Sequence, residues 1–185
     1  MNELNLLDVA RRSIEAHLSK SAQMSQEQTS RSPELAPEIS NTYDDVHGVF
    51  VTLWAEDLRG ELRLRGCIGR HCRLFKTIAE EVADCVCYSA TEDPRFQPVT
   101  IGELNHIKIE ISLLGKPETV SDTSELDPAI YGVIVKNGRR QATLLPEIDG
   151  IDTVEKQLSA VRQKAGIRAD EQVMIFKFSV KKISE

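Results

Sequence analysis

The amino-acid sequence predicts an α+β fold in which antiparallel strands outnumber the helices that flank them. Two hairpin signals and the order of the elements support this prediction. Asn137-Gly138 stands between two apolar runs, which is the strongest short signal for a tight hairpin in the chain. A second turn, residues 56–60, separates two runs with strand character. Because tight hairpins join the strands, an antiparallel sheet is favoured over a doubly wound parallel sheet.

The first predicted element is an amphipathic helix over residues 1–20. Its apolar residues recur at intervals of three and four, and they are Leu4, Leu7, Ala10, Ile14 and Leu18. Residues 21–40 form a polar stretch with little apolar surface to bury, so we expect a flexible linker. Residues 48–185 then form an α/β body, and a chain of 185 residues suits a single domain.

The body begins with a hairpin and a helix. Residues 48–54 are rich in β-branched and aromatic side chains, as strands are, and residues 61–65 alternate polar and apolar. We expect this hairpin to end at residues 66–69. A helix should follow, and one of its faces carries Leu74, Ile78, Val82, Cys85 and Ser89, widened by Phe75, Ala79 and Val86.

The second half of the body repeats this order. Pro94 and Pro98 break the helix, and residues 107–113 alternate as a strand with one buried face. On that strand Glu110 and Ser112 point away from the apolar side, so they are solvated unless that face lines a cavity. The Asn137-Gly138 hairpin, a helix closed by Gly166 and a C-terminal strand complete the chain. Each half therefore contains a hairpin, a helix and a strand, which suggests an internal repeat.

Composition limits the classes of function. The formal net charge of −6 and the pI near 5.3 argue against a protein that wraps nucleic acid. A local basic patch remains, because five arginines and one glutamate lie between Arg59 and Arg73. The N-terminus has no signal-peptide pattern and no apolar run is long enough to cross a bilayer, so we expect a cytoplasmic protein. Its four cysteines are then reduced and form no disulfide framework.

Several motifs, taken in order, resemble the AMMECR1 domain family. They are Gly48-Val-Phe-Val-Thr-Leu53, Leu64-Arg-Gly-Cys-Ile-Gly69, Asp93-Pro-Arg-Phe96, Gly132-Val-Ile-Val135 and Leu144-Leu-Pro-Glu147. The resemblance implies a single domain with a barrel-like antiparallel sheet and helices outside. It also implies a place in one system with a MEMO-like protein and a radical S-adenosylmethionine (radical SAM) protein, as the small component of a modification pathway. The chain departs from the family pattern at residues 70–73, where a stretch ending in proline is usual, and at residues 148–151, which lack the expected aromatic residue.

Cys67 is the main candidate for chemistry. It stands between Gly66 and Gly69 with Arg65 close by, and cations near a thiol favour the reactive thiolate. Arg70 could act in the same way. His71 is a weaker candidate, as a base for the thiol. The alternative is a small, inert side chain between glycines that lets the strand end pack closely.

Residues around Cys67 are candidates for binding, namely Arg65, Gly66, Ile68, Gly69, Asp93, Arg95 and Phe96. Asp93 and Arg95 could place an ion pair beside the thiol, with Phe96 as an aromatic wall. The alternative is a turn in which Asp93 caps the next segment and Phe96 fills the core. Both interpretations can hold at once.

Metal and nucleic-acid sites are weaker hypotheses. Cys67, Cys72, Cys85 and Cys87 do not have the paired spacing of structural zinc sites, so we expect no metal and no cofactor. Residues 66–69 match the Gly-x-x-Gly loop of KH domains, but that loop joins two helices, and nucleic-acid binding is unlikely. Two hypotheses lead: a pathway component that uses Cys67, and a protein-interaction module that uses the surface of residues 63–73.

Overall fold

This computed structural model describes residues 3–24, 43, 45–57 and 59–185. The helices are α1 (Glu3–Met24), α2 (Ile78–Thr91) and α3 (Val154–Ala165), with the short 3₁₀ helices η1 (Ile101–His106) and η2 (Thr123–Glu125). The strands are β1 (Gly48–Glu56), β2 (Leu62–Arg70), β3 (Ile107–Leu114), β4 (Glu118–Thr119), β5 (Tyr131–Asn137), β6 (Arg140–Leu144) and β7 (Met174–Ser184). Of the predicted linker, residues 21–24 belong to α1 and most of the rest lies outside the described residues.

The predicted α+β class is confirmed. In the part of the chain that the structure describes, the strands are hydrogen-bonded in the order β2-β1-β3-β7-β5-β6, and β4 pairs with β7. The β1–β2, β5–β6, β5–β7 and β4–β7 pairings are antiparallel. The predicted β5–β6 hairpin is present, but its turn residues are Gly138 and Arg139, because Asn137 still pairs with Arg140. Gly138 has the positive φ of 59° that the first position of a type II′ turn requires. No helix of the described residues has the length and apolar character needed to span a bilayer.

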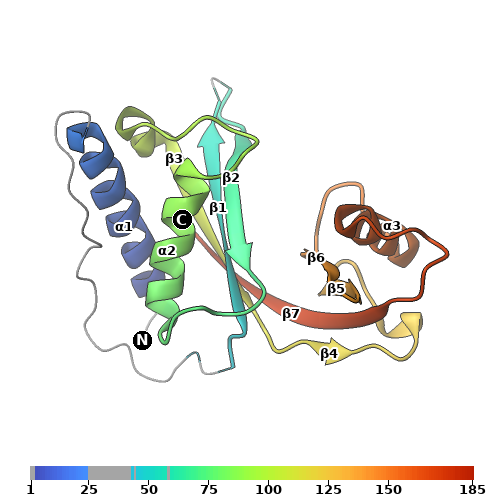
Figure 1. Ribbon diagram of the computed structural model, residues 1–185. Helices are drawn as coiled ribbons and strands as arrows, with labels where there is room; N and C mark the ends of the chain where they lie inside the picture. The colour runs from blue at the N-terminus through green and yellow to red at the C-terminus, as the bar shows by residue number, and fades with distance from the viewer. Residues whose placement is uncertain (1–2, 25–42, 44, 58) are drawn as a thin grey trace. The chain divides into compact units, whose positions relative to one another are not determined.

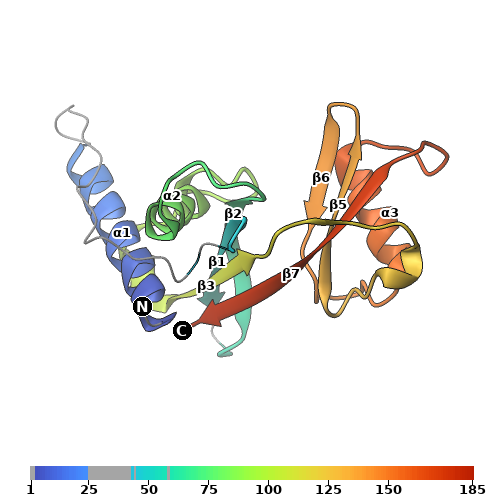
Figure 2. The ribbon, with the colours of Figure 1, turned by 90° about the horizontal axis from the view of Figure 1, so that it is seen from below.

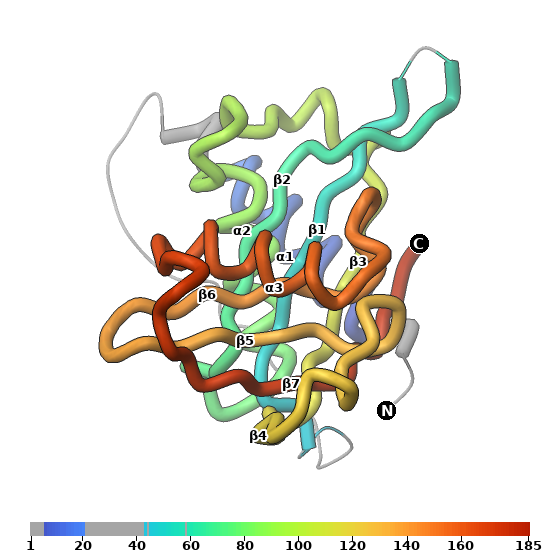
Figure 3. The backbone as a smooth tube through the Cα atoms, turned by 90° about the vertical axis from the view of Figure 1, so that its right-hand side faces the viewer, coloured from blue at the N-terminus to red at the C-terminus, as the bar shows by residue number. Residues whose placement is uncertain are grey.

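The described residues group into two compact units, each with its own apolar core. The first unit takes in the chain up to Leu113 and residues 182–185. Within it, α1 and α2 pack together and α2 covers β1 and β2 (Figures 1 and 2). The second unit takes in residues 114–181, and there α3 covers β5 and β6 (Figure 3).

The two units share one topology, in agreement with the predicted repeat. In each, a hairpin is followed by a helix and then by a strand that pairs with the first strand of the hairpin: β3 with β1, and β7 with β5. Both hairpins begin with a Gly-Val-x-Val segment, at Gly48 and at Gly132. Both helices begin after a threonine N-cap, Thr77 for α2 and Thr153 for α3. Corresponding positions in the two units can therefore be compared one by one.

Two predicted boundaries were wrong. β2 continues through Gly66 and Gly69 to Arg70, so the glycines lie inside a strand and not at its end. α2 begins at Ile78 rather than Leu74, because Thr77 and Glu80 form a capping box that fixes the first turn. Leu74 therefore precedes the helix, and its side chain is 71% exposed.

Candidate functional site

The hairpin of β1 and β2 holds Cys67 opposite Thr52. Their Cα atoms are partners in the antiparallel register, and Thr52 Oγ1 donates a hydrogen bond of 3.3 Å to Cys67 Sγ. Thr52 is buried, whereas Cys67 is half-buried. A hydroxyl that donates to sulfur stabilises the charged thiolate more than the neutral thiol.

Asp93 fixes the backbone of Cys67 from the turn after α2. Its Oδ2 accepts a 2.8 Å hydrogen bond from the Cys67 N–H, and Arg95 donates to both carboxylate oxygens from Nε (3.0 Å) and Nη2 (2.7 Å). The hydrogen bonds from Arg95 lower the pKa of Asp93 to about 2, with a further contribution from the Cys67 N–H. Asp93 therefore stays charged at neutral pH although its side chain is nearly buried.

Arg95 connects this carboxylate to Cys67 and to Phe96. Its guanidinium lies over the Phe96 ring, 5.4 Å from the centroid. Hydrogen bonding to Asp93 raises the pKa of Arg95, and a thiolate at Cys67 would add to that rise. The structure therefore brings together Cys67, Asp93, Arg95 and Phe96, which the sequence named as candidates.

Arg65 is directed away from Cys67 by a β-bulge. The register passes from Leu53–Gly66 to Trp54–Leu64, so Arg65 is an extra residue in β2 without a partner in β1. Its guanidinium donates to Glu103 Oε1 (3.0 Å) and to the carbonyl of Gln97 (2.8 Å). Arg65 thus joins β2 to the segment before β3.

Arg70 lies toward α2 and has its own carboxylate partners. It donates from Nη1 to the fully buried Glu81 (3.0 Å) and from Nη2 to Asp84 (2.6 Å). His71 follows the strand, and burial lowers its pKa, with a smaller contribution from the charge of His47. The two arginines that flank Cys67 in sequence are thus paired with carboxylates of other segments.

Gly66 allows α2 to approach the hairpin closely, and Gly69 allows close packing against β1. A Cβ atom on Gly66 would overlap the carbonyl oxygen of Ser89, and one on Gly69 would overlap the backbone of Val49 and Phe50. Ser89 Oγ accepts from the Ile68 N–H (2.8 Å) and donates to the Val51 carbonyl (2.8 Å). A helix hydroxyl therefore bridges β1 and β2 beside Cys67.

Three residues that shape the site were missed from the sequence: Thr52, Glu81 and Ser89. Glu81 and Ser89 carry a weak signal, since both are polar residues on the buried side of an otherwise apolar helix. Polar groups in such positions need partners, and this need marks them as structural. Thr52 has no such signal, because threonine is common in strands.

The other thiols differ from Cys67. Burial raises the pKa of both Cys85 and Cys87 to about 12, so neither forms a thiolate near neutral pH. Cys72 is exposed, with its sulfur 3.8 Å from His47 Nε2. Among the described residues, no three or more His, Cys, Asp or Glu side chains converge in a way that could hold a metal ion.

Comparisons with known proteins agree on one family. The model of the AMMECR1 family matches residues 7–183, which takes in both units. A protein of Thermotoga maritima is 47% identical over 136 residues, covering 73% of this chain and 76% of its own. The protein PF1979 of Pyrococcus furiosus is 31% identical over 192 residues, covering 97% of this chain and 86% of its own. The crystal structure of the uncharacterised protein PH0010 from Pyrococcus horikoshii superposes with a TM-score of 0.77 at 29% identity, over 97% of this chain and 89% of that one.

Proposed function

Because the chain belongs to the AMMECR1 family, we propose that it is the small component of a cytoplasmic modification pathway. It acts there with a MEMO-like protein and a radical SAM protein. The Arg-Gly-Cys-Ile-Gly segment of β2 is its reactive or ligand-binding site, and Cys67 is the residue that carries the chemistry. The family is one of uncharacterised function, so the support for this proposal comes from the geometry around that sulfur.

One observation carries the proposal: the 3.3 Å hydrogen bond from Thr52 Oγ1 to Cys67 Sγ. It supplies a donor to a half-buried thiol, and Arg95 lies close enough for its pKa to respond to the charge of Cys67. A donor and a cation together favour the thiolate, which is the form that attacks electrophiles or binds ligands. The flanking arginines do not favour the thiolate in this way, because Arg65 is paired with Glu103 and Arg70 with Glu81.

The test is the rate of alkylation at each cysteine. Iodoacetamide at neutral pH, followed by peptide mass mapping, should label Cys67 faster than Cys72, although Cys72 is the more exposed thiol. Thr52→Val, which removes the donor and keeps the shape, should slow labelling of Cys67 by about tenfold, the equivalent of one hydrogen bond. Cys72 serves as the internal control, since its rate should not change.

The outcome that would reject the proposal is a Cys67 that reacts as slowly as the buried Cys85. A second test uses Cys67→Ser in the complete pathway with the two partner proteins. We expect loss of pathway activity with an unchanged unfolding temperature, because serine keeps the size and the backbone bond to Asp93. A variant with full activity would show that the thiol has no chemical role.

A second candidate, a protein-interaction module, is favoured by the segment between β2 and α2. Leu74 is 71% exposed and Phe75 40% exposed, yet the backbone N–H groups of both donate to the buried carboxylate of Glu81, at 2.8 and 3.1 Å. Two apolar side chains are thus held outward on an ordered backbone, as in a binding surface. The partner would be the MEMO-like protein.

Replacing Leu74 and Phe75 together by serine should weaken capture of the MEMO-like protein by about tenfold or more, since each is a large exposed apolar side chain. Arg65 and Arg70 are poor choices for this test, because their carboxylate partners make them part of the fold. Ile148→Ser in the second unit, also an exposed apolar residue, is the matched control. Equal capture by the wild type and the double variant would remove this candidate.

Nucleic-acid binding has less support. Arg63, Arg65 and Arg70 lie within 4 Å of carboxylates, at Asp57, Glu103 and Glu81 respectively. Their charge is therefore largely neutralised within the protein, which leaves little for phosphate groups.

A further inference from the structure

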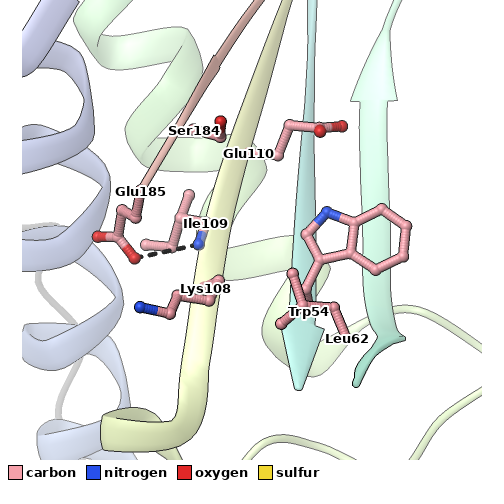
Figure 4. Close-up of a pocket in the computed structure, with 7 residues that line it drawn as sticks. All are labelled: Trp54, Leu62, Lys108, Ile109, Glu110, Ser184 and Glu185. Atoms are coloured by element: carbon pink, nitrogen blue, oxygen red, sulfur yellow. Dashed lines mark hydrogen bonds between the residues drawn. The ribbon is translucent and has the colours of Figure 1, made fainter. Parts of the chain in front are cut away.

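A pocket of about 300 Å³ in the first unit lies apart from Cys67, on β1, β2, β3 and the end of β7 (Figure 4). Trp54 and Leu62 form its apolar wall, and Leu62 is 53% exposed. Lys108, Glu110 and Glu185 supply its charged groups. The volume is at the lower end of the range for ligand sites, which is room for one extended side chain.

The three charged groups are not equivalent. Glu185 forms an ion pair with Arg11 and accepts a 3.1 Å hydrogen bond from the Ile109 N–H. Figure 4 shows Lys108 extending toward Glu185, and Glu110 extending the other way, toward the strand that carries Trp54. Among the described residues, the side chain of Glu110 takes part in no hydrogen bond or ion pair. One carboxylate in the pocket is therefore available to a ligand, on the side where the indole lies.

We propose that this pocket binds a primary alkylammonium group, of the kind that a lysine side chain carries. Its methylene stem would lie along Trp54 and Leu62, and its ammonium would meet the Glu110 carboxylate beside the indole. Aromatic faces attract cations, and long amines cover apolar surface with their stems while the charged end meets a polar partner. A carboxylate ligand would instead be repelled by Glu110.

Trp54 is the only tryptophan of the chain, so its fluorescence reports on this pocket alone. The probe is pentylammonium chloride at pH 7, where the amine is charged, with total ionic strength held constant by NaCl. We expect a saturable change in Trp54 emission in the millimolar range. Pentanol, which has the same stem without the charge, should bind at least about fivefold more weakly, and pentanoate should have no effect.

Two variants separate the contributions of Glu110 and Lys108 to the binding of the amine. Glu110→Gln should abolish the difference between pentylammonium and pentanol, whereas the matched Lys108→Gln should keep it and strengthen amine binding by about twofold. Thermal unfolding of both variants checks that they fold. The proposal is wrong if pentylammonium and pentanol act alike on the wild type, if pentanoate binds better than the amine, or if Glu110→Gln keeps the preference for the amine.

A further binding measurement distinguishes a lysine side chain of a polypeptide from a free alkylamine as the ligand. Nα-acetyl-lysinamide presents the same stem and charge together with two peptide groups. Binding tighter than that of pentylammonium assigns the pocket to a lysine side chain of a polypeptide, and equal or weaker binding assigns it to a free alkylamine. Either result upholds a site for an alkylammonium group, provided that the Glu110→Gln variant loses it.

Discussion

The first and second units share one topology, yet they attach the helix to the hairpin with different chemistry. Arg70 in β2 pairs with the first valine of Gly48-Val-Phe-Val51, and at the corresponding position of β6 stands Leu144, opposite Val133. The fourth residue of α2 is Glu81, and the fourth residue of α3 is Gln157. An ion pair in the first unit is thus replaced by an apolar residue and a neutral amide in the second.

The same difference extends along the hairpin. Cys67, opposite Thr52, corresponds to Gln141, opposite Lys136, and Gly66 corresponds to Arg140. Ser89, the twelfth residue of α2, corresponds to Ala165, the twelfth of α3. The second unit holds its helix with a 2.8 Å bond from Gln157 Nε2 to the Tyr131 carbonyl. Attachment of the helix therefore does not require the charges of the first unit, and the candidate site belongs to that unit alone.

The largest expected loss of stability comes from replacing Glu81 of α2 by glutamine, the residue at the corresponding position of α3. Glu81→Gln leaves Arg70 without its buried partner, and we expect a loss of about 3 to 5 kcal/mol in the free energy of unfolding. The double variant Glu81→Gln, Arg70→Leu copies the Gln157 and Leu144 of the second unit and should recover part of that loss. Urea unfolding measures all three proteins. Equal stability of Glu81→Gln and the wild type would show that the ion pair does not hold the helix.

A smaller loss of stability is expected on replacing Gly66 of β2, whose counterpart in β6 is Arg140. Gly66→Ala places a methyl group against the Ser89 carbonyl, so α2 must move away, at a cost of about 2 to 3 kcal/mol. Gly102→Ala is the matched control, because a Cβ there has no neighbour within 4 Å. The two variants are compared by urea unfolding. A Gly66→Ala protein as stable as the control would mean that the close approach of α2 is not required.

The smallest expected effect is the loss of the stability that Asp93 contributes as the pH falls. The pKa of Asp93 in the folded protein is about 2, below its ordinary value of 3.8, so its contribution to stability is complete above about pH 5 and is lost as pH falls through 4 to below 2. Because Arg95 is half-exposed, we expect Asp93→Asn to cost about 1 to 2 kcal/mol at pH 7 and much less at pH 2. Unfolding free energies across this pH range provide the measurement.

The control for this pH dependence lies in the second unit, where Arg140 holds the pKa of Glu171 at about 2. The Glu171 side chain is 19% exposed, against 3% for Asp93, so Glu171→Gln should show a weaker effect that added salt reduces. If the two variants respond alike to acid and salt, burial of Asp93 does not strengthen its ion pair.

Local patterns in the sequence predicted much of the fold. The hairpin near Asn137-Gly138, the helix closed by Gly166 and the alternation of residues 107–111 depend on neighbours in the chain, and each was found as expected. The alternation fails at Ser112, which is fully buried. Gly166 has a φ of 65°, the left-handed conformation of a helix C-cap. The predicted start of α2 was too early because Leu74 and Phe75 continue the apolar spacing of the helix, whereas the capping box of Thr77 and Glu80 fixes its first turn.

The site was harder to predict than the fold. Basic residues near Cys67 were expected to act on it, but what an arginine contacts depends on chain segments far away. Glu103 lies 38 residues from Arg65, and the bulge that turns Arg65 toward it depends on the register with β1. Asp93 and Arg95 were correctly grouped as an ion pair, because they are neighbours in one tight turn. That Asp93 also holds the Cys67 backbone, 26 residues away, has no sequence signal.

The bond between Asp93 and the Cys67 N–H also limits how other proteins can approach β2. In the described part of the sheet this strand is at the end of the order, where exposed amides usually invite another chain to add a strand. Here the amide at Cys67 is already satisfied by a carboxylate, and a bulge interrupts the strand nearby. An added strand therefore cannot pair with the Cys67 amide unless it displaces Asp93, which disfavours edge-to-edge association at this point of β2.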